Sequence, residues 1–193
     1  MGKTSSKKEK FVAPAKRSNW PIVLAAAGLI IVLSVGGYLL LGKNTSGTSA
    51  KATASIGETV KYSPNEQLQQ TKVPNSIQNG KVTVATLSQV RQAKFTWTEY
   101  KNNGKRVPVT AFAQPNGKLL VAVSLCEPCN SENFHITGDK IICNACGTTW
   151  DLNTLKGLSG GCQQYPPDAL SYTVNGDNIQ VDQAVLDAWK PRV

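Results

Sequence analysis

The hydrophobic positions of the chain form one long apolar run followed by a series of short segments. The run covers residues 20–42, and no side chain between Pro21 and Leu41 is charged. About 20 apolar residues are enough to cross a bilayer as a helix, and aromatic residues such as Trp20 and Tyr38 favour its interfaces. We therefore expect a transmembrane helix over 20–42. The alternative, a cleaved signal peptide, has an apolar core of about 7–15 residues, which is shorter than this run.

The residues after this run divide into a polar stretch and a patterned stretch. Residues 43–80 are mostly small and polar, which predicts a flexible tether. From residue 81 onward, short apolar segments end at the turn signals NNGK (102–105) and QPNG (114–117), which predicts an antiparallel meander up to about residue 125. The expected fold is therefore mainly β, with a small antiparallel domain over 81–193 that follows the transmembrane helix.

Two further elements are expected near the end of the sequence. The segment SYTVNGDNIQV predicts a hairpin around Asn175 and Gly176. The segment DQAVLDAWK predicts a short amphipathic helix that packs through Val185, Leu186 and Trp189.

The distribution of charge predicts the orientation of the chain. The formal net charge is +9, and residues 1–19 contribute six basic side chains against one acidic side chain. Basic residues beside a membrane helix stay on the cytoplasmic side, so residues 1–19 should be a cytoplasmic tail and the domain extracytoplasmic. Elsewhere Lys and Arg are scattered singly among acidic residues, which argues against a nucleic-acid partner. The expected location is a bacterial cell membrane, with a single pass.

Four of the five cysteines form two C-x-x-C pairs, Cys126 with Cys129 and Cys143 with Cys146. Thiolates are metal ligands, and two such pairs supply the four donors of a tetrahedral site. Asn130 follows the first pair and Gly147 follows the second. Both residue types tolerate the positive φ with which a metal-binding knuckle ends, so the spacing predicts two knuckles around one centre.

The spacing leaves the occupant of the four cysteines open. Zinc, mononuclear iron and a [2Fe–2S] cluster all accept four thiolates. Two disulfides between the pairs are the alternative outside the cytoplasm. Few large apolar residues are expected over 126–162, which predicts that metal–thiolate bonds order this region.

Two further side chains are candidates for places beside the ligands. His135, the only histidine, lies between the two pairs, and a lone loop histidine is more often solvated than a ligand. Cys162 follows two glycines, and it could be a ligand, a redox-active thiol or a buried small residue. We expect it near the centre but outside its four principal ligands.

The strand pair, both knuckles and the Gly-Gly-Cys sequence occur in this order over residues 94–170, and this stretch resembles the FtrD-like membrane iron–sulfur family. The resemblance implies a Rieske-like arrangement in which two cysteine loops enclose the metal, with Trp150 and Leu155 packed beside it. It also implies an association with membrane ferrous-iron transport and redox systems. Larger members carry several membrane helices, whereas a single helix makes no pore.

The resemblance assigns roles to individual residues. It implies ligand roles for Cys126, Cys129, Cys143 and Cys146, and a role in the site for Cys162. The chain departs from the family pattern after Cys162, where three residues precede Pro166.

These observations favour an electron carrier or accessory protein over an enzyme. No Ser-His-Asp arrangement or phosphate-binding glycine loop is present, and one histidine offers little acid–base chemistry. The leading hypothesis is a membrane-anchored extracytoplasmic metalloprotein with an iron–sulfur centre. It would act in electron transfer or redox-linked iron uptake with a membrane redox or metal-transport partner. The alternatives are a zinc-ribbon-like binding module and a thiol–disulfide redox protein that uses Cys162.

Overall fold

The computed structural model describes Gly2 and residues 54–193. The transmembrane helix predicted over 20–42 lies outside the described residues. Within the described part of the chain, no helix has the length and apolar character needed to cross a membrane.

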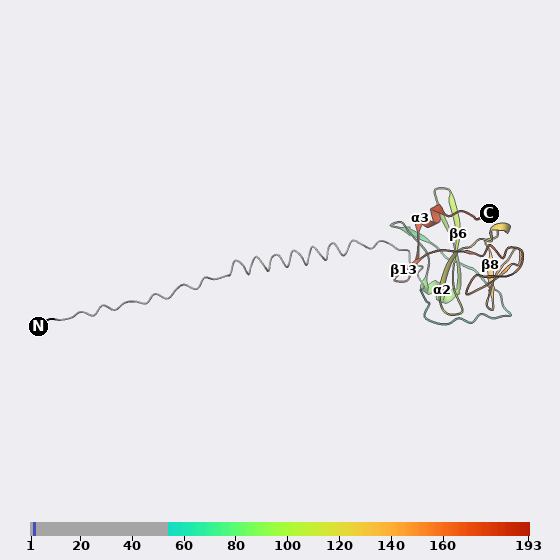
Figure 1. The fold of residues 1–193 in the computed structure, drawn as a ribbon, viewed down its shortest axis with the longest axis horizontal. Helices are drawn as coiled ribbons and strands as arrows, with labels where there is room; N and C mark the ends of the chain where they lie inside the picture. The colour runs from blue at the N-terminus through green and yellow to red at the C-terminus, as the bar shows by residue number, and fades with distance from the viewer. Residues whose placement is uncertain (1, 3–53) are drawn as a thin grey trace. The chain divides into compact units, whose positions relative to one another are not determined.

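Residues 54–193 form a domain of three sheets and two short α-helices, which confirms the predicted mainly β fold (Figure 1). The site sheet contains, in spatial order, β1 (Leu68–Gln69), β8 (Phe134–Thr137), β9 (Lys140–Cys143), β10 (Thr149–Asp151) and β11 (Gly157–Ser159). The central sheet contains β12 (Asp168–Ala169), β7 (Leu119–Val123), β6 (Lys105–Ala113), β5 (Phe95–Asn102) and β2 (Thr71–Lys72). The outer sheet contains β13 (Thr173–Asn175), β14 (Asn178–Asp182), β4 (Lys81–Thr86) and β3 (Ser76–Gln78). All pairings are antiparallel except the parallel pair β2–β5.

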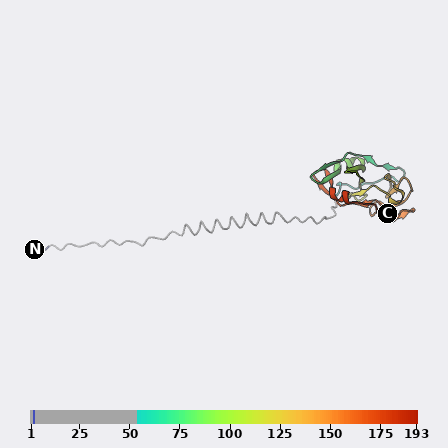
Figure 2. The ribbon, with the colours of Figure 1, turned by 90° about the horizontal axis from the view of Figure 1, so that it is seen from above.

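The central sheet takes part in two hydrophobic cores. Alternating residues of its strands, such as Val107 and Val109, pack with Val82 and Val181 of the outer sheet. Phe95 and Phe112 belong to a second core, which they form with residues of the site sheet. Their rings pack edge to face, with the ring centroids 5.7 Å apart. The site sheet, marked by β8, and the outer sheet, marked by β13, accordingly lie on opposite sides of β6 (Figures 1 and 2).

The predicted hairpins are confirmed by the pairing of the strands. β5 and β6 are joined through Asn103 and Gly104, which both have positive φ, as the tightest hairpin turns require. β6 pairs with β7 across the predicted QPNG turn, and β13 pairs with β14 across Gly176.

A helix interrupts the meander that was predicted over 81–125. α2 (Leu87–Ala93) follows β4, and its N-terminus has a capping box in which Thr86 and Gln89 bond each other's backbone N–H groups. The segment was expected to continue as sheet because its apolar residues suit a strand as well as a short helix. The helix predicted near residue 183 is confirmed as α3 (Gln183–Ala188). In α3, Leu186 is buried as expected, whereas Val185 is 39% exposed.

The flexible tether predicted over 43–80 does not extend into the described residues. β1, β2 and β3 each join a different sheet, and Ile56, Val60 and Val73 are buried in the core. Single apolar residues separated by polar ones gave no periodic signal, because these strands are only two or three residues long.

Candidate metal centre

The first knuckle begins where the chain leaves β7. Cys126 precedes the 3₁₀ turn η1 (Glu127–Cys129), and Asn130 ends the turn with a φ of 53°. The Asn130 N–H donates to the Glu127 carbonyl, and the Cys126 N–H donates to the Ser131 carbonyl at 2.7 Å. These bonds fold the segment back on itself, so that both sulfurs lie on the same side of the turn.

The second knuckle follows β9, whose last residue is Cys143. Gly147 has a φ of 69°, and its N–H donates to the Cys143 carbonyl at 3.0 Å. The Cys143 N–H donates to the Thr148 carbonyl at 3.0 Å, which closes the loop where β10 is about to start. The positive φ predicted for Asn130 and Gly147 is therefore confirmed at both knuckles.

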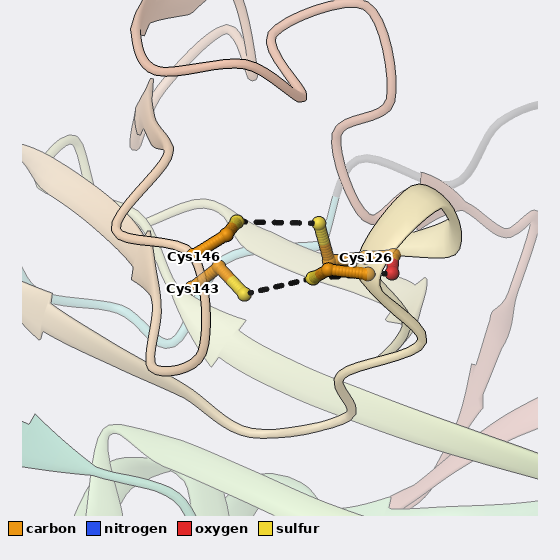
Figure 3. Close-up of side chains that lie close together, drawn as sticks. Cys126, Cys143 and Cys146 are labelled. Atoms are coloured by element: carbon orange, nitrogen blue, oxygen red, sulfur yellow. Dashed lines mark hydrogen bonds between the residues drawn. The ribbon is translucent and has the colours of Figure 1, made fainter.

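The two knuckles bring four sulfurs together (Figure 3). The Sγ atoms of Cys126, Cys129, Cys143 and Cys146 all lie within 4.8 Å of one another. Across the gap between the knuckles, Cys129 Sγ is 3.6 Å from Cys143 Sγ, and Cys126 Sγ is 3.8 Å from Cys146 Sγ. Four thiolates bound at about 2.3 Å around one tetrahedral ion would be about 3.8 Å apart. The donor set and its spacing therefore fit a metal ion.

The site lies against the second hydrophobic core, the one that contains Phe95 and Phe112. Cys126 and Cys143 are buried in a cluster with Phe134, Ile141 and Trp150. The expectation that the region 126–162 has few large apolar side chains is therefore wrong. Its apolar residues are separated in sequence, but the strand pairing of β8, β9 and β10 places them on one face of the site sheet.

Comparison with models of known protein families shows which family the chain belongs to. The model of the family described as membrane iron-sulfur containing protein FtrD-like matches residues 90–193, more than half of the chain. The chain belongs to this FtrD-like family. The match includes both knuckles and Cys162, which agrees with the resemblance seen in the sequence.

The other comparisons add little to the family assignment. A ferredoxin from Sphingomonas yanoikuyae B1 is similar to this FtrD-like protein at 19% identity and a TM-score of 0.36, over 45% of this chain and 84% of the ferredoxin. A TM-score this low supports no conclusion about fold or function. Comparison with curated proteins gives no match.

The four thiols of the FtrD-like site differ in exposure and in pKa. Burial raises the pKa of Cys126 well above its usual range and raises that of Cys129 to about 11. Burial acts to raise the pKa of Cys146, but hydrogen bonds with Thr148, Cys143 and Cys129 together bring this pKa down to about 6. Cys146 is the exposed member of the four. Cys146 therefore combines an exposed residue with a lowered thiol pKa.

Cys162 lies beside this exposed ligand candidate. Its Sγ is 3.8 Å from Cys146 Sγ, and it belongs to the same buried cluster as Trp150 and Leu155. Thr148 Oγ1 accepts the Cys162 N–H at 3.1 Å and lies 3.3 Å from Cys146 Sγ. Cys162 is thus adjacent to the four-sulfur group without being part of it, and Trp150 and Leu155 pack where the sequence predicted.

His135 lies close to the second knuckle, where its ring contacts the side-chain amide of Asn144. Its Nδ1 lies 2.6 Å from Asn144 Oδ1, and Asn144 Nδ2 donates to Gln69 Oε1 at 3.0 Å. Asn144 is one of the two residues between Cys143 and Cys146. His135 therefore helps to hold the knuckle, and it is not one of the four clustered donors.

Sequence reasoning missed two residues that shape the first knuckle. Glu127 is buried inside the C-x-x-C turn, and both of its oxygens accept from Arg192. Arg192 also donates to the Pro166 carbonyl and lies over the Tyr165 ring. The sequence did contain a signal for this pair. Glu127 places a carboxylate between the two cysteines of the first C-x-x-C pair, and a charge that is buried there requires a partner.

Proposed function

We propose that this FtrD-like domain is an electron carrier that holds one iron ion through Cys126, Cys129, Cys143 and Cys146. The observation behind this proposal is the compact set of four sulfurs, all within 4.8 Å. In a [2Fe–2S] cluster the thiolates bind two different irons, which spreads the four sulfurs further apart than a single ion does. When bound, iron supplies a one-electron couple.

The residues around the sulfurs suit electron transfer better than acid–base catalysis. Phe134 and Trp150 exclude water from the buried side of the site. Cys146 is an exposed residue and marks the side from which a partner protein can approach the site. Residues 141–150 and 157–167 contain no charged side chain, so no fixed charge lies along these two segments. The one histidine is engaged with Asn144.

We further propose that residues 20–42 anchor the domain outside a cell membrane, where it serves a redox or ferrous-iron uptake partner. Support comes from the uncharged apolar run, the basic residues before it and membership of a membrane iron–sulfur family. Protease added to intact cells should digest the domain. Complete protection of the domain while the membrane stays sealed would contradict this topology.

The metal assignment is tested on the full chain, purified in detergent without oxygen. We expect one iron per chain, no acid-labile sulfide, and a visible spectrum that bleaches and returns in a reversible one-electron titration. Cys143→Ser should lose the metal, whereas His135→Ala should keep it because His135 is not among the clustered donors. Two irons with two sulfides would indicate a [2Fe–2S] cluster. A colourless protein with one zinc would indicate a structural, zinc-ribbon-like role.

A further inference from the structure

The proposed metal site uses four of the five cysteines and leaves Cys162 without an assigned role. Cys162 is 8% exposed, and its Sγ lies 3.8 Å from Sγ of Cys146. An exposed cysteine with a second thiol at this distance is the arrangement of redox-sensitive cysteine pairs, in which the neighbour resolves the oxidised form.

The contacts of the loop 157–163 place Cys162 at this position. Thr148 Oγ1 lies between the two cysteines, since it accepts the Cys162 N–H and contacts Cys146 Sγ. A Cβ at Gly160 would come within 2.5–2.9 Å of Thr148 atoms, so the loop approaches the knuckle as closely as glycine allows. The Trp150 Nε1 donates to the Gln163 carbonyl at 3.1 Å and fixes the other end of the loop.

We propose that Cys162 is the resolving thiol of Cys146, and that peroxide converts the two into a disulfide that opens the metal site reversibly. The Cys146 sulfur attacks hydrogen peroxide, the O–O bond breaks, Cys146 becomes a sulfenic acid and one water leaves. The Cys162 sulfur then attacks the sulfenic sulfur, the S–O bond breaks, the S–S bond forms and a second water leaves. Two thiols lose two electrons and two protons, and peroxide is reduced to two waters.

The disulfide has a consequence for the metal. Once Cys146 is bonded to Cys162, three thiolates remain for the ion, and the site loses its fourth donor. A dithiol reductant restores both thiols by exchange, so the site can be refilled. Without a resolving thiol, excess peroxide carries Cys146 on to sulfinic acid, which a dithiol does not reverse.

Two other sulfur pairs are equally close, and metal binding separates them from this pair. Cys126 is 3.8 Å from Cys146, and Cys129 is 3.6 Å from Cys143. On the proposed function Cys126, Cys129 and Cys143 are all held by the metal, whereas Cys162 is outside the group of ligands. Cys162 is therefore the thiol that can react with Cys146 while the other three cysteines stay bound to the metal.

The sequence allows the pairs to be told apart by tryptic digestion. Cys126 and Cys129 fall on residues 119–140, Cys143 and Cys146 on 141–156, and Cys162 on 157–192. The full chain as purified, with its metal bound, is treated with equimolar peroxide, alkylated and digested. We expect a linked pair of 141–156 with 157–192, with fragmentation placing the bond at Cys146. A link between 119–140 and 141–156 instead would overturn the proposal.

A variant tests the protective role of the same thiol. After peroxide and then dithiothreitol with added metal, the wild-type chain should regain its metal. Cys162→Ser should not regain it and should carry sulfinic acid at Cys146. Equal recovery in Cys162→Ser and wild type would refute the resolving role. If Cys162→Ser does not fold, the wild-type peptide map decides. Because zinc would hold the same four cysteines, the Cys146–Cys162 link is expected whether iron or zinc is the native occupant, so failure of the iron assignment leaves this test intact.

Discussion

Thr148 connects the backbone of Cys162 with the sulfur of Cys146. Its hydroxyl oxygen accepts the N–H of Cys162, which leaves its hydrogen free to donate to the sulfur of Cys146. Thr148 is fully buried, so water does not replace this donor when it is removed. A donor to a ligand sulfur stabilises the more negative, reduced form of a metal–thiolate centre.

Thr148→Val should therefore lower the midpoint potential of the metal-loaded chain. One hydrogen bond of about 1 kcal/mol corresponds to about 40 mV for a one-electron couple. Thr148→Ser keeps the hydroxyl and should leave the potential near the wild-type value. The measurement is a redox titration followed by the visible spectrum. An unchanged potential in Thr148→Val would mean that the hydroxyl does not act on the sulfur.

At the scale of elements, the site depends on how closely the loop between β11 and β12 packs against the second knuckle. Gly160 has a φ of 98° and faces Thr148, while its neighbour Gly161 has open space at the position of a Cβ. The two glycines are adjacent, but their structural requirements differ.

Gly160→Ala should destabilise the domain by about 2 kcal/mol, because the new methyl group meets Thr148 and the backbone is strained for an L residue. It should also weaken metal retention, since Thr148 contacts Cys146. Gly161→Ala is the matched control and should change little. The checks are the urea midpoint and the metal content after dialysis against a chelator. Equal effects of the two substitutions would argue against the close packing described here.

The turn after β10 has a charged acceptor at its start. Asp151 Oδ1 accepts from the backbone N–H groups of Asn153 and Thr154 and from the Thr154 hydroxyl. The hydroxyl of Thr154 is the main cause that holds the pKa of Asp151 below its usual value. This turn places Leu152 and Leu155 in the second core.

A carboxyl with a depressed pKa stabilises the fold above its unfolded pKa of about 3.9, and this contribution is lost as the pH falls through the folded value. Asp151→Asn should therefore be less stable than wild type at pH 6, and the difference should shrink below pH 4. Urea unfolding of the metal-free chain at both pH values tests this. A difference that stays constant with pH would exclude the carboxylate charge as its cause.

The sequence predicted the elements whose signals are local. The positive φ of Asn130 and Gly147 follows from residue type and position, and the hairpin at Gly104 follows from its turn residues. The capping box of Thr86 and Gln89 was also a local signal, but the apolar residues around it fit a strand equally well. The distance between Cys162 and Cys146 was beyond local reasoning, because it depends on the pairing of β10 with β11 and on Gly160.

At the scale of the whole molecule, the first knuckle is tied to a distant segment. Glu127 is buried, and its carboxylate pairs with Arg192, which is separated from it by 65 residues. The first knuckle therefore receives its counter-charge from outside both the site sheet and the central sheet.

Arg192→Ala should destabilise the domain by about 2 kcal/mol, because it leaves a buried carboxylate without a partner. Arg192→Lys should be intermediate, since it keeps the charge but loses the fork geometry. The double variant Glu127→Gln with Arg192→Ala should recover part of the loss, as no unpaired charge remains. Urea unfolding of the wild type, Glu127→Gln, Arg192→Ala and the double variant gives the coupling between the two side chains. Additive effects would show that the pair is not coupled.

The pairing of Glu127 with Arg192 also has a consequence for the timing of assembly. During synthesis both knuckles leave the ribosome well before Arg192, and β4 emerges well before its neighbour β14. A nascent chain that captured metal at once would do so with the Glu127 carboxylate still lacking its counter-charge and with the outer sheet incomplete. We therefore expect the centre to be loaded after Arg192 has left the ribosome, when its pairing with Glu127 is possible.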